Sequence, residues 1–144
     1  MSKNELVEYW LSSAELDEAA FYHLMESKDN HWALFMGHIV IEKLLKALIT
    51  QNNEEGVAVP RSHDLLLLAQ KALLSFDERT EDLLDLISTF NLNARYPDYK
   101  QAFYKKCTNE YTEERAVEMK EVIAWLKSLI LPQLEGSHSD TPTQ

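Results

Sequence analysis

The sequence predicts an all-α protein, a single domain of about five helices. The chain has 144 residues, which is close to the commonest size of one domain. It contains only 3 Gly and 4 Pro, and these fall mostly between periodic stretches. Within those stretches apolar residues recur at spacings of three and four, the repeat of one face of an α-helix.

The first two helices are predicted from about Asn4 to Glu26 and from Asp29 or Asn30 to Gln51. In the first helix a single stripe holds the apolar residues, and Asp17 is the one charged residue on it. The second helix has a wider apolar face, which predicts a central position in the domain. Either Asp29 or Asn30 is suited to cap its start.

Three more helices are predicted at roughly His63 to Leu74, Glu78 to Leu92, and from Thr112 to Pro132, with caps at Ser62 and Thr112. Residues 93–111 hold five aromatic residues and one Pro without a helical repeat, which predicts an ordered loop. Residues 1–134 therefore form one domain. Residues 135–144 form a polar tail that has no apolar residues to bury and is expected to be disordered.

The charge balance restricts the possible partners. Fourteen Lys and Arg against 24 Asp and Glu give a net charge of −10, so most of the surface repels phosphates and anionic membranes. A polyanion must then bind at a local basic island. Cys107 is the only cysteine, which excludes an intrachain disulfide and suits a reducing, cytoplasmic setting. No stretch approaches the roughly 18 apolar residues of a membrane span, and no membrane partner is expected.

One segment is both basic and aromatic. Between residues 95 and 106 four cations face a single Asp, a local balance of +3, and Tyr96 is one of four aromatic residues among them. Cations bind phosphates and aromatic rings stack on bases, so this segment suits a nucleotide or a short RNA. We expect Arg95 to contact a phosphate or a partner. We expect Tyr96 to stack on a base or to position the bound group. The alternative is a loop packed by its tyrosines, with Arg95 paired to an internal carboxylate such as Asp17.

A charged group interrupts the apolar second helix at Glu42, Lys43 and Lys46. Glu42 and Lys46 are spaced i, i+4, which is worth about 0.3–0.5 kcal/mol if the pair is exposed. One interpretation is a solvated helix face. The other is a polar patch beside a pocket, where Lys43 and Lys46 complement a bound charge and Glu42, together with Asp17, orients Arg95.

The start of the third helix is the next candidate, because an N-terminus favours an anion. His63 would contact a phosphate or carboxylate there together with Arg61, or Asp64 would simply cap the helix. The histidines form no convincing metal set, since His38 and its neighbour Glu42 at i, i+4 supply only two ligands. No metal and no cofactor is expected.

Four short motifs resemble those of a known family. Trp10, Ala14, Asp17 and Ala20 resemble the opening pattern of HEPN domains, and residues 42–47 resemble that family's Glu-Lys-x-x-Lys-Ala signature. His63-Asp64-Leu65 resembles its third-helix start, and residues 94–98 (Ala-Arg-Tyr-Pro-Asp) resemble a segment of one bacterial and archaeal branch. The motifs occur in the family's order and span nearly the whole chain.

The resemblance implies an up-and-down helical bundle that is often a homodimer and is frequently paired with a small nucleotidyltransferase, commonly in toxin–antitoxin arrangements. Many HEPN members are metal-independent RNases that use an Arg, a gap of four to six residues, and a His. Arg61 and His63 are too close for this pattern, and Arg79, Arg95 and Arg115 have no His at the required distance. Because this proton-transfer His is missing, we expect a non-catalytic module that binds a nucleotide or docks a nucleotidyltransferase.

Two alternatives remain open from the sequence. The first is an RNase toxin with a displaced active site, in which His63 is the acid or base and Arg95 the phosphate clamp. It requires the chain after the fourth helix to approach the start of the third. The second is a purely structural helical partner without a ligand, which the amphipathic helices and the acidic charge also permit.

Overall fold

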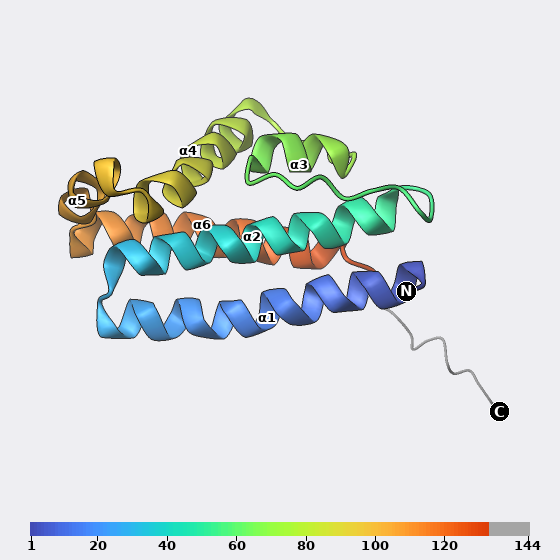
Figure 1. Cartoon of the computed structure of the whole chain (residues 1–144), viewed down its shortest axis with the longest axis horizontal. Helices are drawn as coiled ribbons and strands as arrows, with labels where there is room; N and C mark the ends of the chain where they lie inside the picture. The colour runs from blue at the N-terminus through green and yellow to red at the C-terminus, as the bar shows by residue number, and fades with distance from the viewer. Residues whose placement is uncertain (133–144) are drawn as a thin grey trace.

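A computed structural model describes residues 1–132 and shows six α-helices in that range (Figure 1). Their bounds are α1 Lys3–Ser27, α2 Asn30–Asn52, α3 Leu65–Lys71, α4 Glu78–Arg95, α5 Pro97–Lys106 and α6 Asn109–Leu129. The all-α prediction is confirmed, and the predicted polar tail, residues 135–144, lies outside the described residues. Within the described part of the chain, no helix combines the length and the apolar character needed to cross a membrane.

Helix α2 lies at the centre of the bundle, as its wide apolar face predicts. It packs against all five other helices, with α1 and α6 along much of its length. Helices α3 and α4 cover a further side of α2, and α5 closes one end near the α1–α2 turn (Figure 1). The main hydrophobic core is formed by residues from all six helices. Burial of this core is the main force that holds the helices together.

Local signals in the chain set the ends of α1. Ser2 and Glu5 form a capping box, in which Ser2 Oγ accepts from the Glu5 N–H at 3.1 Å and Glu5 Oε1 accepts from the Ser2 N–H at 2.8 Å. Lys28 ends the helix in the left-handed region, with φ 61°. Its N–H donates to the carbonyl groups of Leu24 and Met25, and the chain reverses there so that α2 runs back along α1 (Figure 1).

The structure corrects the prediction for residues 93–111. This segment contains α5, and α4 and α6 extend into it from either side, where an ordered loop was expected. Pro97 occupies the first turn of α5, a position where its missing N–H costs nothing. Phe103 is the one buried residue of α5 and packs on Phe90 with ring centroids 5.4 Å apart. A ten-residue helix with one buried side chain has too few apolar positions to show a helical repeat.

Two predicted caps are also wrong by a few residues. Asp64 rather than Ser62 caps α3, because the Asp64 carboxylate accepts from the Leu67 N–H at 3.2 Å. Thr108 rather than Thr112 caps α6, since its hydroxyl oxygen accepts from the N–H of Tyr111 at 3.1 Å. Thr112 itself is buried within α6. In both cases several neighbouring residues are suited to cap, and tertiary packing selects among them.

Candidate functional site

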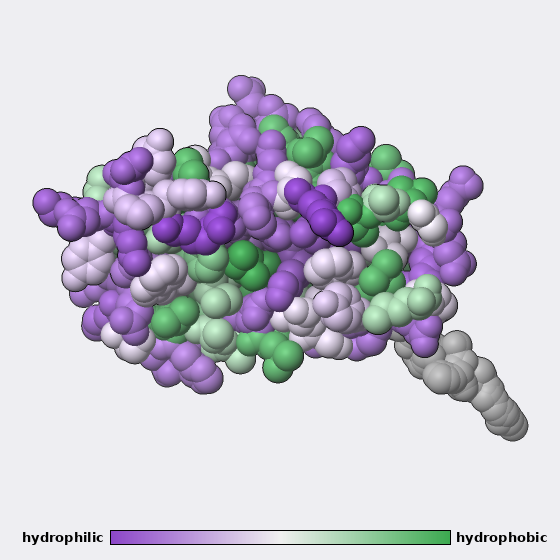
Figure 2. Space-filling view, in the orientation of Figure 1, coloured by the Kyte–Doolittle hydropathy of each residue, from purple (hydrophilic) through white to green (hydrophobic). Residues whose placement is uncertain are grey.

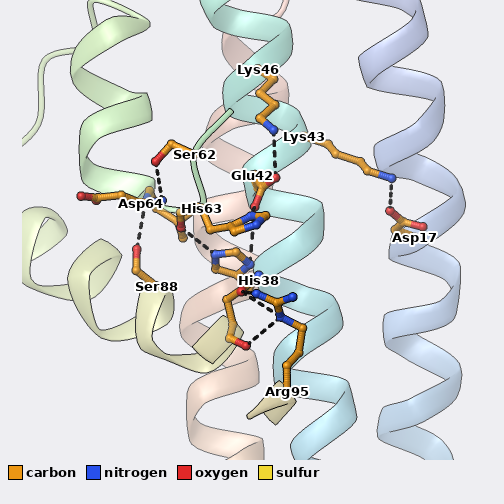
Figure 3. Close-up of polar contacts among 12 residues, drawn as sticks. Asp17, His38, Glu42, Lys43, Lys46, Ser62, His63, Asp64, Ser88 and Arg95 are labelled. Carbon is orange, nitrogen blue, oxygen red and sulfur yellow. Dashed lines mark hydrogen bonds and ion pairs between the residues drawn. The ribbon is translucent and has the colours of Figure 1, made fainter. Parts of the chain in front are cut away.

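Three polar side chains form a line along α2 on the side that faces the α2–α3 loop and α4 (Figure 3). His38, Glu42 and Lys46 are spaced four residues apart and therefore share one helix face. His38 is fully buried and Glu42 is only 6% exposed. Buried polar groups of this kind must be satisfied by partners, because their desolvation otherwise costs several kcal/mol.

Glu42 lies at the centre of this line. Its Oε2 accepts from Lys46 Nζ at 3.0 Å, and its Oε1 accepts from His63 Nδ1 at 2.8 Å. His63 comes from the loop before α3, and its side chain is 56% exposed. A carboxylate oxygen only accepts, so Nδ1 of His63 carries the hydrogen and Nε2 is left for another partner. The Glu42–Lys46 pair is therefore part of a buried cluster, and the expectation of a solvated face is wrong.

His38 also holds His63, through the main chain. His38 Nε2 donates to the carbonyl oxygen of His63 at 3.0 Å. The other ring nitrogen, Nδ1, has no hydrogen-bond partner within residues 1–132 and lies 3.9 Å from Glu42 Oε1. Burial, the largest effect, lowers the pKa of His38. The hydrogen bond to the His63 carbonyl and the Glu42 charge raise it by less, and the charges of His63 and Arg95 lower it by less still. Its imidazole is therefore held in the neutral form.

Arg95 lies in the last turn of α4, close to His38 (Figure 3). Its Nε and Nη2 donate to Asn91 Oδ1 at 3.1 and 2.7 Å, and the guanidinium lies 5.3 Å from the centre of the Tyr96 ring. In the described part of the chain no carboxylate lies within 4.0 Å of this guanidinium. Arg95 is thus held by a neutral amide, and its guanidinium is exposed to solvent without an ion pair among the described residues.

The expectation that Asp17 and Glu42 orient Arg95 is wrong. Asp17 accepts from Lys43 Nζ at 2.6 Å, and the same ammonium group donates to Ser13 at 2.7 Å. Asp17 lies on α1 and Arg95 on α4, on opposite sides of α2 (Figure 3). Glu42 is hydrogen-bonded to His63 and Lys46 instead. The central helix therefore separates the predicted partners.

The structure brings together five of the predicted site residues and sets two apart. His63, Glu42 and Lys46 form one hydrogen-bonded cluster, and Arg95 with Tyr96 borders it beside His38. Lys43 and Asp17 form a separate pair between α1 and α2. The sequence analysis assigned no role to His38, although its i, i+4 spacing to Glu42 was a signal for it. In Figure 2 the most hydrophilic surface of this face follows the seam of α2 with α3 and α4.

Two of the remaining cations of the basic-aromatic segment lie over aromatic rings of the same chain. Lys100 lies over the Trp32 ring at 4.8 Å, and Lys106 lies over the Tyr111 ring at 5.4 Å. Tyr96, by contrast, is 47% exposed. The accessible part of the predicted island therefore includes Arg95 and Tyr96 at the junction of α4 and α5, and continues along α5 through Tyr99 and Lys105.

Other chemistry is restricted by the surroundings. Burial raises the pKa of the Cys107 thiol to about 11, so this side chain is protonated at neutral pH and a poor nucleophile. Residues 1–132 contain no group of three or more His, Cys, Asp or Glu placed to hold a metal ion. A groove of about 520 Å³ between α4 and α6 has a mixed lining that includes Arg79, Glu118 and Trp125, but none of the candidate residues.

Comparison with protein families matches the model described as HEPN domain to residues 7–129. The match runs from the first turns of α1 to the last residue of α6 and includes every residue of the cluster around Glu42. A comparison with curated proteins gave no match. A comparison with solved structures gave none either.

Proposed function

The chain belongs to the HEPN domain family, and we propose that it is a non-catalytic member that binds a phosphate group of a nucleotide or RNA end through Arg95. The observation that carries the proposal is that the exposed guanidinium of Arg95 is held by Asn91 and has no ion pair among the described residues. Asn91 accepts from Nε and Nη2, and Nη1 has no acceptor among the described residues. A fixed guanidinium with unused donors matches the geometry of a phosphate group.

The surroundings of Arg95 favour a nucleotide over a simple anion. Tyr96 is half exposed next to the guanidinium, and an exposed aromatic ring stacks on any base. Nε2 of His63, which accepts hydrogen bonds in this tautomer, suits a donor such as a ribose hydroxyl, and Glu42 holds the ring in one orientation. The net charge of −10 repels phosphates from the rest of the surface. Together these features support one local site for a single nucleotide unit.

Calorimetric titration with ATP and with a short RNA tests this proposal. We expect saturable binding to the wild-type chain and a loss of about tenfold or more in Arg95→Ala, because a hydrogen bond to a charged group contributes about 1.5–3 kcal/mol. Arg79→Ala is the matched control, since it removes the same charge from an exposed position in the first turn of the same helix. Circular dichroism checks that each variant keeps its helices.

Equal affinities for Arg95→Ala and Arg79→Ala would contradict a site at Arg95. No heat with either ligand, even for the wild-type chain, would reject nucleotide binding. The chain would then be a structural helical partner, the ligand-free alternative.

We further propose that the partner protein is a small nucleotidyltransferase, that the chain forms a homodimer, and that the two proteins act as a toxin–antitoxin pair. Family membership supports these three statements, since such pairing and self-association are common among HEPN proteins. Sedimentation velocity of the isolated chain tests the homodimer. Co-expression with a nucleotidyltransferase encoded beside it tests the pair, and separate elution of the two proteins would reject it.

The Glu42–His63 pair favours a second candidate, a metal-independent RNase. It requires the chain after the predicted end of the fourth helix to approach the start of α3, and Arg95 from that segment and His63 both lie close to His38. Nε2 of His63 would take the proton of a ribose 2′-hydroxyl while its oxygen attacks phosphorus. A cyclic phosphate forms, the bond to the 5′-oxygen breaks, and water protonates the leaving oxygen. Arg95 would stabilise the phosphate charge.

Incubation of RNA with the protein in the presence of EDTA separates the two candidates. Cleavage that is lost in His63→Ala, while Arg95-dependent binding remains, would establish the RNase and replace the non-catalytic assignment. Intact RNA at high protein concentration, together with binding, supports the non-catalytic module.

A further inference from the structure

We propose that His38 is a positioning residue, which holds the main chain of His63 so that the His63 imidazole meets Glu42 and presents its free nitrogen outward. The hydrogen bonds that carry this inference are those of His38 Nε2 and Glu42 Oε1, at 3.0 and 2.8 Å. The presented nitrogen accepts hydrogen bonds, so it suits a ribose hydroxyl or a base N–H beside the phosphate, and that role rests on the proposed function. The positioning itself does not, and it is measured without a ligand.

His38 and Glu42 hold residue 63 at two points. They lie one helical turn apart on the same face of α2, about 6 Å along its axis. His38 contacts the carbonyl group of His63, and Glu42 contacts the imidazole. Because both contacts come from one rigid helix, they fix the backbone position and the ring position of His63 together.

His63 needs this support because its own segment supplies little. It lies in the loop before α3, and its side chain is 56% exposed, so packing alone does not select one rotamer. Its bond to Glu42 also requires the hydrogen on Nδ1. Free imidazole prefers the hydrogen on Nε2. The observed contact therefore holds His63 in its less common tautomer, and it persists only while the ring stays in register with Glu42.

The surroundings of His38 fit a polar role better than a role in filling the core. A buried imidazole costs desolvation free energy that an aliphatic side chain of similar size would avoid. The ionisable groups that face His38 are Glu42 from α2, His63 from the loop and Arg95 from α4. The one hydrogen bond that His38 makes in the described structure is to the His63 carbonyl. Holding that carbonyl is thus the function that its position allows.

Two amide substitutions of different length test the inference. In His38→Gln the side-chain nitrogen reaches nearly as far as the imidazole Nε2, whereas in His38→Asn it stops at the position of Nδ1 and cannot reach the carbonyl. Nitrogen-15 NMR of the histidine rings, near pH 8, reports the tautomer of each ring. The signals of His63 are assigned by their loss in His63→Ala.

We expect His63 to carry its hydrogen on Nδ1 in the wild-type chain and in His38→Gln, and to shift toward the Nε2 form in His38→Asn. His38→Leu, which keeps the volume and removes the donor, should behave as His38→Asn does. Affinity for ATP should fall at least threefold in the Asn and Leu variants and less in the Gln variant. An unchanged tautomer in folded His38→Asn or His38→Leu would overturn the inference. A wild-type chain that binds no ATP would reject the phosphate site, while the tautomers would still decide the role of His38.

Discussion

Glu42 is a buried carboxylate. The desolvation free energy of its burial is offset by hydrogen bonds from two N–H donors, Lys46 and His63. Removing its charge leaves the Lys46 ammonium, whose side chain is only 12% exposed, without a counter-ion. We therefore expect Glu42→Gln to lower the free energy of unfolding by about 3 kcal/mol. Urea denaturation followed by circular dichroism measures this loss. The double variant Glu42→Gln with Lys46→Met should recover most of it, and a double variant as unstable as the single one would contradict the explanation.

His38 should make the stability sensitive to mild acid. Burial lowers its pKa in the folded state below the ordinary value of 6.5, so the unfolded chain binds more protons. Stability from this group is complete above pH 6.5 and is lost as the pH falls through the lower, folded-state pKa. The loss is at most about 1.4 kcal/mol per pH unit. His31 acts in the same direction, because its pKa is also lowered by burial.

Comparison of the wild-type chain with His38→Gln isolates the part of this effect due to His38. Urea midpoints measured between pH 5 and pH 8 should fall less steeply toward acid in the variant, which keeps the hydrogen bond but cannot be protonated in this range. Parallel curves for the two proteins would show that His38 does not cause the acid sensitivity.

Sequence motifs named part of the candidate site residue by residue. Glu42, His63, Arg95 and Tyr96 became candidates in this way, because each occupies a position of a recognisable motif. Their partners were not found, since spacing along the chain does not tell which helix faces meet. Asn91, for example, holds Arg95 from one turn earlier in α4, but the helix was predicted to end at Leu92, so this i, i+4 pair was missed.

Among the elements, α5 shows most clearly where a helical repeat fails as a signal. It has one buried residue, Phe103, and its start depends on Pro97. The long helices α1, α2 and α6 were predicted within a few residues, because each buries a face over several turns. Short elements that depend on a single tertiary contact are visible only when the position of that contact is known.

Phe103 should therefore control the order of α5. Phe103→Ala removes the ring that packs on Phe90, and such a loss costs about 3–5 kcal/mol when the cavity does not collapse. We expect the amides of α5 to lose hydrogen-exchange protection first, while those of the central helix α2 stay protected. Tyr99→Ala, which removes a side chain that is 49% exposed from the same helix, is the control and should leave the protection unchanged.

If α5 in Phe103→Ala kept the same protection as in the wild-type chain, Pro97 and the local helix propensity would be sufficient to form it. The contact with Phe90 would then be a consequence of the helix and not its cause.

For the molecule as a whole, the acidic surface makes the Arg95 site an isolated one. With a net charge of −10 and one accessible guanidinium at the junction of α4 and α5, a bound RNA gains no further favourable phosphate contacts along its length. We expect the logarithm of affinity to fall with the logarithm of salt concentration with a slope of about −0.7, the value for one phosphate contact on a single strand. Lengthening the RNA should leave both affinity and slope nearly unchanged.

Fluorescence anisotropy with labelled RNAs of increasing length, measured from about 50 to 200 mM salt, gives this slope directly. Arg95→Ala is the control and should remove the salt-dependent part of the binding. A slope steeper than about −2 would correspond to roughly three phosphate contacts. It would show that exposed lysines of α5, namely Lys100, Lys105 and Lys106, also bind the strand, so that α5 as a whole forms the nucleic-acid surface. A slope near −0.7 would instead show that these lysines make no phosphate contact and that the site takes one nucleotide.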